Sequence, residues 1–369
     1  MSYSHNYNAS SYGTLFNKGK GIYLFDDKGN KYYDLSMGSG VHILGHSNKK
    51  IIKAITKQAT KLIVSQKNNK NNKILTDLIA KHTPAHINNY VFSNSGSEAV
   101  QRAVRLARAS TGKMTVASLC TGWHGVSDIT LYKGTGVDIT HKLSIPNIDH
   151  AVNFIHKYHD ELAAFIVEPI QQTNPVRKTR LLKNIEQVCK EHNIVLIFDE
   201  SITGFRYAIE GVSPSMGVQP DIIVYGKAVG GGLPIGITAF TDKIANTTFL
   251  DNTKDIWTGG TFSLNPLTSS AAIATIKQLE YSDYIHLDCL GIYFRNMLRA
   301  ANIECVGTGS ISRILGIENK DKFIALLFKD KVLYPTNGLL FTSFKHSFMD
   351  IYVIANKIIK AYRQINEQI

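Results

Sequence analysis

The sequence has few of the features that mark secreted or membrane-spanning proteins. Its 369 residues include four dispersed cysteines and no C-x-x-C pair, so neither a disulfide framework nor a cysteine zinc site is expected. No apolar run approaches the roughly 20 residues that cross a bilayer. The polar opening, residues 1–14, lacks the basic start and hydrophobic stretch of a signal peptide. We expect a cytoplasmic protein with reduced thiols and no membrane contact.

Acidic residues are also in short supply: 29 Asp and Glu stand against 41 Lys and Arg, a formal net charge of +12. Such a balance suits nucleic acid or anionic small molecules. The basic residues are dispersed, and the only cluster, KNNKNNK at 67–73, is as rich in Asn as in Lys. We therefore expect no nucleic-acid partner and favour carboxylated or phosphorylated small molecules.

The middle of the chain alternates between strand and helix patterns. Short apolar runs predict strands at 90–93, 115–119, 163–169, 194–200, 221–226 and 235–240. Amphipathic spacing predicts helices between them at 97–110, 149–158 and 180–192. This alternation is typical of an α/β protein with a mostly parallel sheet and helices on both faces.

The two ends of the chain have a different pattern. Residues 21–35 predict a hairpin of two aromatic-rich strands, and helices are predicted at 48–64 and 71–82. The last third predicts an α+β lobe, with helices at 268–281, 284–301 and 348–364. We expect the hairpin to join this lobe, because nothing else would cover its aromatic face. The expected domains are an N-terminal segment joining the small domain (1–50), a large domain (51–267) and a C-terminal small domain (268–369).

Reactive groups are sought at the carboxyl ends of strands, where ligands bind in parallel sheets. After the strand that ends at Ser93, a Ser/Gly turn leads into a helix near Ser97. Gly96 permits close backbone approach, the helix start favours an anion, and the hydroxyls of Ser95 and Ser97 are donors, so the turn can cup a phosphate. The spacing from Ser95 to Glu98 equally fits an ordinary capping box.

Asp199 ends the apolar strand 194–198, and a carboxylate there needs a partner. A protonated pyridine nitrogen would serve, and so would a structural salt bridge or a metal ion. A Walker B strand is disfavoured, because the sequence contains neither GKS nor GKT.

Lys227 directly follows the strand 221–226 and precedes Ala-Val-Gly-Gly-Gly. A lysine among small residues at a strand end is partly desolvated, which lowers its pKa and frees the amine as a nucleophile; an ordinary surface lysine is the alternative. A phosphate cup, a strand-end Asp and a strand-end Lys, in that order along successive α/β units, are what a pyridoxal-phosphate (PLP) site requires.

Seven motifs in order extend this pattern along nearly the whole chain: the 21–35 hairpin with LGH (44–46), NSGSEA (94–99), WHG (123–125), EPI (168–170), FDESITGFR (198–206), GKAVGGGLPIG (226–236) and GGTFSLNP (259–266). With them the chain resembles the class III (ornithine/GABA-type) aminotransferases of PLP fold type I, and most of all the glutamate-1-semialdehyde aminomutase branch.

The resemblance implies roles for individual residues. Lys227 matches the lysine that carries PLP as a Schiff base, and Asp199 the partner of the pyridine nitrogen. Gly96 and Ser97, beside Ser95, match the donors to the cofactor phosphate. Trp123 matches the aromatic side chain that stacks on the ring, although a core tryptophan is the alternative.

Further roles are implied around this set. His124 and Glu200 resemble residues that support the cofactor site. Thr261 matches the threonine that reaches the phosphate of the neighbouring subunit's cofactor, which implies a homodimer with shared sites. Arg206 is more consistent with a structural role than with substrate binding.

Some positions depart from the family pattern. Ser201 stands where the family usually has a valine on the ring face, and Lys18 where the aminomutase branch has an arginine for the substrate carboxylate. The aminomutase signature near the C-terminus, which carries a glutamate, becomes PTNGLLF (335–341), and the stretch from Gly136 to Pro146 is shorter. These departures favour a ping-pong aminotransferase with an amino-acid donor, glutamate by family habit, and a small carbonyl acceptor, anionic or phosphorylated.

The alternatives are an aminomutase at the same site, a nicotinamide-dependent oxidoreductase, and a catalytically dead scaffold on this fold. No GxGxxG opens a helix, which disfavours the oxidoreductase, and the presence of both Lys227 and Asp199 disfavours the scaffold. The metal-like spacing of His82 and His86 is interrupted by Pro84, and His156 and His159 are expected to be solvated on a surface helix with no carboxylate motif nearby. We expect no metal.

Overall fold

The computed structural model describes residues 14–65, 67–131, 135, 138–249 and 256–366. The opening considered for a signal peptide, residues 1–13, and Gly136 at the shortened stretch lie outside these ranges. Among the described helices, none combines the length and the apolar character that crossing a bilayer requires.

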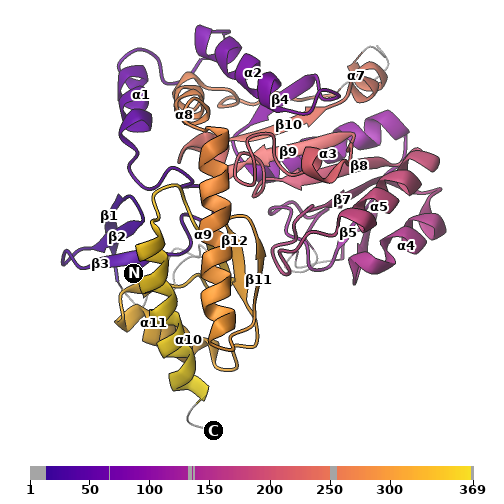
Figure 1. Ribbon diagram of the computed structural model, residues 1–369. Coiled ribbons are helices and arrows are strands. Elements are labelled where there is room, and N and C mark those ends of the chain that lie inside the picture. The colour runs from indigo at the N-terminus through magenta and orange to yellow at the C-terminus, as the bar shows by residue number, and fades with distance from the viewer. Residues whose placement is uncertain (1–13, 66, 132–134, 136–137, 250–255, 367–369) are drawn as a thin grey trace, which may run out of the picture.

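A seven-stranded sheet forms the centre of the larger lobe (Figure 1). In spatial order its strands are β4 (Asn89–Ser93), β10 (Gly236–Phe240), β9 (Ile222–Gly226), β8 (Val195–Glu200), β7 (Leu162–Val167), β5 (Thr115–Leu119) and β6 (Lys142–Ile145). The pairs from β9 to β6 are parallel, whereas β10 runs antiparallel to both of its neighbours. The predicted mostly parallel α/β sheet is confirmed.

Helices cover both faces of this sheet because successive side chains of each strand point to opposite faces. Ala164 and Ile166 of β7 pack toward α3 (Gly96–Thr111), whereas Phe165 and Val167 pack toward α4 (Ala151–Tyr158) and α5 (Thr179–Glu191). The long apolar strand runs of the sequence follow from this burial on both sides.

The six predicted strands and the main predicted helices are present, and some short elements were missed. Strand β6 is a four-residue edge strand with partly exposed residues, so it has no continuous apolar run. Helices α7 (Asp242–Phe249) and α10 (Lys320–Lys329) were also missed. The larger lobe also contains three longer helices, α1 (Lys49–Ala59), α2 (Lys70–His82) and α8 (Pro266–Ile276). Its remaining helices are short: α6 (Ser213–Met216), η1 (Ile148–His150) and η2 (Lys227–Gly230).

The chain ends meet in a second lobe, where the first strands lie beside the C-terminal helices (Figure 1). The predicted hairpin consists of β2 (Tyr23–Asp26) and β3 (Lys31–Asp34), with β1 (Phe16–Lys20) on one side and β13 (Val332–Leu333) on the other. Strands β11 (Cys305–Thr308), β12 (Ile311–Ile314) and β14 (Leu339–Phe341) form a separate sheet. Helices α9 (Tyr281–Ala300), α10 and α11 (Phe348–Asn366) pack around one apolar core.

Buried Arg206 connects the two lobes. Its guanidinium donates to the carbonyl oxygens of Gly40 (2.7 Å) and Thr342 (2.8 Å) and to Ser310 Oγ (3.2 Å). Burial lowers the pKa of this arginine to about 9. Arg206 thereby holds together segments that are far apart in the sequence.

Candidate active site

A cavity of about 210 Å³ opens at the carboxyl ends of the central strands. The two neighbouring parallel strands β8 and β9 bring Asp199 and Lys227 to this edge, and the start of α3 brings Gly96 and Ser97. These residues line the cavity together with Val100, Trp123, His124, Gly125, Ser201 and Gly226. Groups separated by more than a hundred positions in the sequence thus share one space.

Asp199 is buried, and both of its carboxylate oxygens accept hydrogen bonds. Oδ2 lies 2.9 Å from His124 Nδ1, and Oδ1 accepts from Ser201 Oγ (2.6 Å) and Ser201 N (3.0 Å). Burial alone would raise the pKa of Asp199, but the bonds from His124 and Ser201 outweigh it and lower that pKa. Burial likewise disfavours the charged form of His124, and Asp199 outweighs it and raises the pKa of the imidazole.

Lys227 opens onto the cavity and is partly accessible. Desolvation lowers the pKa of its amine, against the opposing charges of Asp199 and Glu168. Its backbone lies in the left-handed region, with φ of 47°. A lysine rarely adopts this conformation, and such strain is concentrated at functional sites.

The start of α3 borders the cavity with backbone and hydroxyl donors. Ser95 is the N-cap, and its Oγ accepts from Glu98 N (3.2 Å), as the capping-box interpretation requires. Ser97 Oγ accepts from Val126 N (3.1 Å). A Cβ atom at Gly96 would lie 3.2 Å from Ser201 Oγ, so a side chain there would point into the cavity. The helix start therefore presents an open cup for an anion.

Trp123 and Glu200 lie in different settings. Trp123 lines the cavity and is 51% exposed, which excludes its interpretation as a core tryptophan.

Glu200 is fully buried on the other side of β8, where its carboxylate accepts from Val212 N (2.8 Å) and Ser213 N (3.1 Å). Because strand side chains alternate, Asp199 and Glu200 cannot face the same space. The carboxylate of Glu200 therefore anchors a loop and does not line the cavity.

Two further candidates lie outside the cavity of their own chain. Thr261 is exposed, in a segment held to α3 by a bond from Arg102 Nη2 to Gly259 O (2.9 Å). Lys18 is exposed on β1, with its ammonium 5.3 Å from the Phe25 ring centroid.

Glu168 is a buried carboxylate, coupled electrostatically to His124, Asp199 and Lys227, that the sequence analysis did not single out. It follows β7, is 5% exposed, and accepts from Trp123 N (3.3 Å) and Gln172 Nε2 (3.2 Å). Burial raises its pKa to about 7. The signal was present in the EPI motif, since a carboxylate after an apolar strand needs a partner, as at Asp199.

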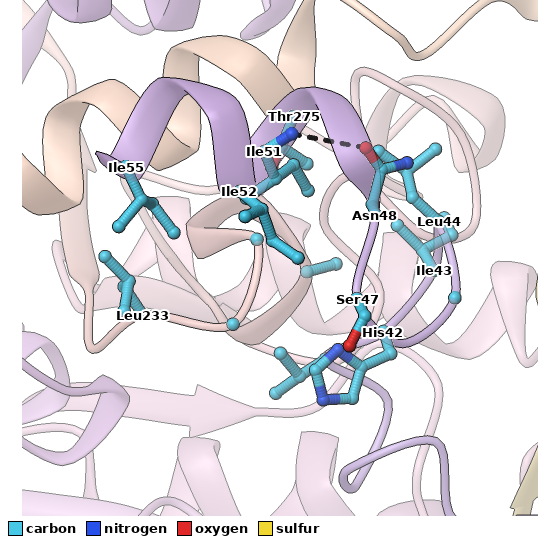
Figure 2. Close-up of a pocket in the computed structure, with 15 residues that line it drawn as sticks. His42, Ile43, Leu44, Ser47, Asn48, Ile51, Ile52, Ile55, Leu233 and Thr275 are labelled. Carbon is cyan, nitrogen blue, oxygen red and sulfur yellow. Dashed lines mark hydrogen bonds between the residues drawn. The ribbon is translucent and has the colours of Figure 1, made fainter. Parts of the chain in front are cut away.

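A second hollow, of about 180 Å³, borders the turn that follows Lys227 (Figure 2). Ala228, Gly231 and Gly232 form part of its wall, and Ile55 of α1 points toward Leu233 across it (Figure 2). Its lining is mostly apolar and, unlike that of the first cavity, contains no carboxylate.

Known proteins agree with the site in both sequence and fold. The family model of the class-III aminotransferases matches residues 3–303. Glutamate-1-semialdehyde 2,1-aminomutase of Thermoplasma volcanium is 35% identical over 286 residues, covering 72% of this chain and 67% of that protein. The enzyme of the same name from Methanobrevibacter smithii is 32% identical, covering 94% of this chain and 91% of its own.

The fold is shared with solved transaminases. An omega-transaminase from Sphaerobacter thermophilus superposes with a TM-score of 0.89 at 22% identity, covering 97% of this chain and 92% of that one. Adenosylmethionine-8-amino-7-oxononanoate aminotransferase from Methanocaldococcus jannaschii gives a TM-score of 0.86 at 23% identity, covering 98% and 97%. The chain belongs to the class-III aminotransferases, PLP-dependent enzymes of fold type I.

Proposed function

We propose that the 210 Å³ cavity holds PLP, with Lys227 as its covalent attachment and Asp199 as the partner of its ring nitrogen. The observation that carries this proposal is that an amine of lowered pKa and a buried carboxylate line one cavity from neighbouring strands. PLP supplies a conjugated ring that withdraws electrons from the carbon bearing the amino group.

Several features of the cavity suit this group. The helix start at Gly96 and Ser97 offers donors to a phosphate. His124 Nε2 is buried and has no hydrogen-bond partner among the described residues, which is expected of a site built for an additional polar group. The exposed Trp123 indole is free to cover a ring face from the solvent side.

With PLP bound, Asp199 and Lys227 would have different roles in the reaction. Asp199, held by His124 and Ser201, stays ionised and keeps the ring nitrogen protonated. With PLP bound, the free amine of Lys227 would take the proton from the carbon that bears the donor nitrogen and would deliver it to the cofactor carbon on the other side of that nitrogen. Desolvation lowers the pKa of Lys227, which increases the fraction of the amine that is neutral and able to accept this proton.

We infer an aminotransferase that moves an amino group from an amino-acid donor, glutamate by family habit, to a second, small carbonyl compound. The stretch that departs most from the aminomutase pattern, 335–341, lies beyond residue 303, where the family match ends. Lys18, expected to bind an anionic acceptor, does not line the cavity, so any such role requires a partner subunit or a moved segment.

Intramolecular transfer, as in an aminomutase, is the second candidate. It is favoured by the relatives at 32–35% identity named glutamate-1-semialdehyde 2,1-aminomutase. Spectra of the purified protein, mixed with single amino donors, separate the two. A transaminase releases a keto acid and accumulates the aminated cofactor, whereas a mutase returns one rearranged product. A colourless protein that takes up no PLP would contradict both candidates, and Lys227→Ala should lose the covalent link.

We further propose a homodimer in which Thr261 of each subunit contributes to the partner's cavity. Trp257 (73% exposed) and Phe262 (57%) place apolar surface beside Thr261, as expected of a covered face. Mixing Lys227→Ala subunits with Thr261→Ala subunits tests this. One intact site forms in each mixed dimer only if Thr261 acts across the interface, so activity should return on mixing. Mixtures no more active than their parents would contradict the shared site.

The domain boundaries and the cellular location stay predictions. One part of the expected division into 1–50, 51–267 and 268–369 is supported by the pairing of β3 with β13, which joins an early and a late segment of the chain in one sheet. The boundary at 267 is not supported, because Ala271 and Ile276 of α8 pack in the core of the larger lobe. The described cysteines are unpaired, as expected of a cytoplasmic protein.

A further inference from the structure

Three imidazoles and a carboxylate meet on the surface where two helices end. His156 lies in the last turn of α4 and His159 caps that helix, while Glu191 is the last residue of α5 and His192 caps it. We call these four residues the imidazole cluster. Solvated histidines without a nearby carboxylate were expected here, but the fold brings Glu191 and His192 beside His156.

The spacing of this cluster fits one ion. His156 Nδ1 lies 2.9 Å from His192 Nε2. A Glu191 carboxylate oxygen and one ring nitrogen of each of these histidines lie within 4.8 Å of one another. Zn²⁺ binds imidazole nitrogens at about 2.0–2.1 Å, so two nitrogens on one ion lie roughly 3 Å apart. Small side-chain rotations are therefore sufficient to place all three ligand atoms around a metal.

The ring of His159 packs against the ring of His192. The two ring centroids lie 4.2 Å apart at an interplanar angle of 35°. Nδ1 of His159 lies 2.8 Å from the backbone carbonyl oxygen of His156.

Groups of both negative and positive charge surround the imidazole cluster. The ends of α4 and α5 carry the negative poles of both helices, which favour a cation, and Asp160 lies 3.3 Å from His159 Nε2. Against this, Lys113 Nζ donates to the carbonyl oxygen of His159.

We propose that the imidazole cluster binds a divalent transition-metal ion through His156, Glu191 and His192, with the ring of His159 packed against that of His192. Imidazole combined with a carboxylate suits Zn²⁺, Co²⁺, Ni²⁺ or Cu²⁺ better than Mg²⁺ or Ca²⁺. Because the side chains of His156 and Glu191 are exposed, water can complete the coordination. The ion would join the ends of α4 and α5, which pack through Ile155 and Val188, and has no part in amino transfer.

Titration of the chelator-treated holoenzyme with Zn²⁺ alone tests the site, with calorimetry and thermal unfolding as readouts. We expect wild type to bind one equivalent that His156→Ala and His192→Ala bind about 100-fold more weakly or not at all, and Zn²⁺ to raise the Tm of wild type only. Affinity should fall between pH 7.5 and 5.5, because protons compete for the imidazoles.

His150→Ala is the matched control, since it removes another exposed histidine just before α4. It should bind Zn²⁺ as wild type does. Glu191→Gln keeps the side-chain size and tests the carboxylate if the histidine variants do not fold. The proposal is overturned if wild type, His156→Ala and His192→Ala bind the same number of ions with the same affinity, which would leave only a hydrogen bond between two imidazoles.

Discussion

Asp199 and Glu200 are consecutive residues of β8, yet their carboxylates serve opposite faces of the strand. Asp199 lines the cavity with His124 and Ser201, and Glu200 accepts from the backbone of Val212 and Ser213 on the other side. Two buried acids on one strand are therefore placed for separate roles, Asp199 for the proposed chemistry and Glu200 for the fold.

Asp199→Asn should reduce catalysis and leave the fold intact. The amide keeps the shape of the side chain but removes the charge proposed to hold the ring nitrogen protonated. Removing an electrostatic contact of this kind costs about 10²–10³-fold in kcat. Stopped-flow measurement of the half-reaction with an amino donor checks this, with circular dichroism as the control for folding. A rate within tenfold of wild type would remove Asp199 from the mechanism.

Glu200→Gln should lower the stability of the fold and leave catalysis nearly unchanged, the reverse of what is expected for Asp199→Asn. The amide has one acceptor oxygen, so at least one of the three donors, Val212 N, Ser213 N or Thr203 Oγ1 (2.9 Å), loses its hydrogen-bond acceptor. Leaving a buried donor unsatisfied costs about 1–3 kcal/mol. Chemical unfolding should show this loss, while kcat of the folded holoenzyme stays near wild type. A variant of normal stability that has lost its activity would assign Glu200 to the chemistry instead.

Ser201→Val should raise the pKa of Asp199. The Ser201 hydroxyl donates to Asp199 Oδ1 at 2.6 Å, and hydrogen bonds to charged groups contribute about 1.5–3 kcal/mol. The lowered pKa of Asp199 supplies stability above the unfolded value of 3.8, and that stability is lost as the pH falls through the folded pKa. In the variant this loss begins at higher pH.

An acid titration of the bound-cofactor absorbance measures the effect of Ser201→Val. The absorbance should disappear at higher pH in this variant than in wild type, and Ser201→Thr, which keeps the hydroxyl, should restore the wild-type curve. Coincident curves for valine and threonine would show that the hydroxyl does not tune Asp199.

Glu168→Gln should change how stability depends on pH. Burial raises the pKa of Glu168 from 4.5 to about 7, so the folded state binds this proton more tightly than the unfolded chain. Below pH 4.5 the Glu168 carboxyl does not lower the free energy of unfolding. As the pH rises to 7 the loss of unfolding free energy grows and reaches about 3 kcal/mol. Because glutamine cannot ionise, the stability of the variant relative to wild type should increase as the pH rises from 4.5 to 7.

Unfolding of wild type and Glu168→Gln in parallel, at pH values from 4.5 to 8, checks that prediction. Comparing the two proteins removes the contribution of the other titrating groups. A stability difference that stays constant over the whole range would mean that folding does not raise the pKa of Glu168.

The sequence by itself determined the sheet and the place of the site. Strands buried on both faces need continuous apolar runs, and such runs are visible without coordinates, as in 163–169 and 194–200. Because the carboxyl ends of parallel strands share one edge, the order of Gly96, Asp199 and Lys227 along the chain was sufficient to predict one cavity.

Only the tertiary structure decided which side chains enter that cavity and which meet elsewhere. Lys18 lies outside it, and Glu168 and the imidazole cluster gain their partners from distant segments. His156 and His192 are 36 positions apart, and nothing in either local sequence signals the other. Such contacts depend on how helices and strands pack, which a local pattern of polar and apolar residues does not specify.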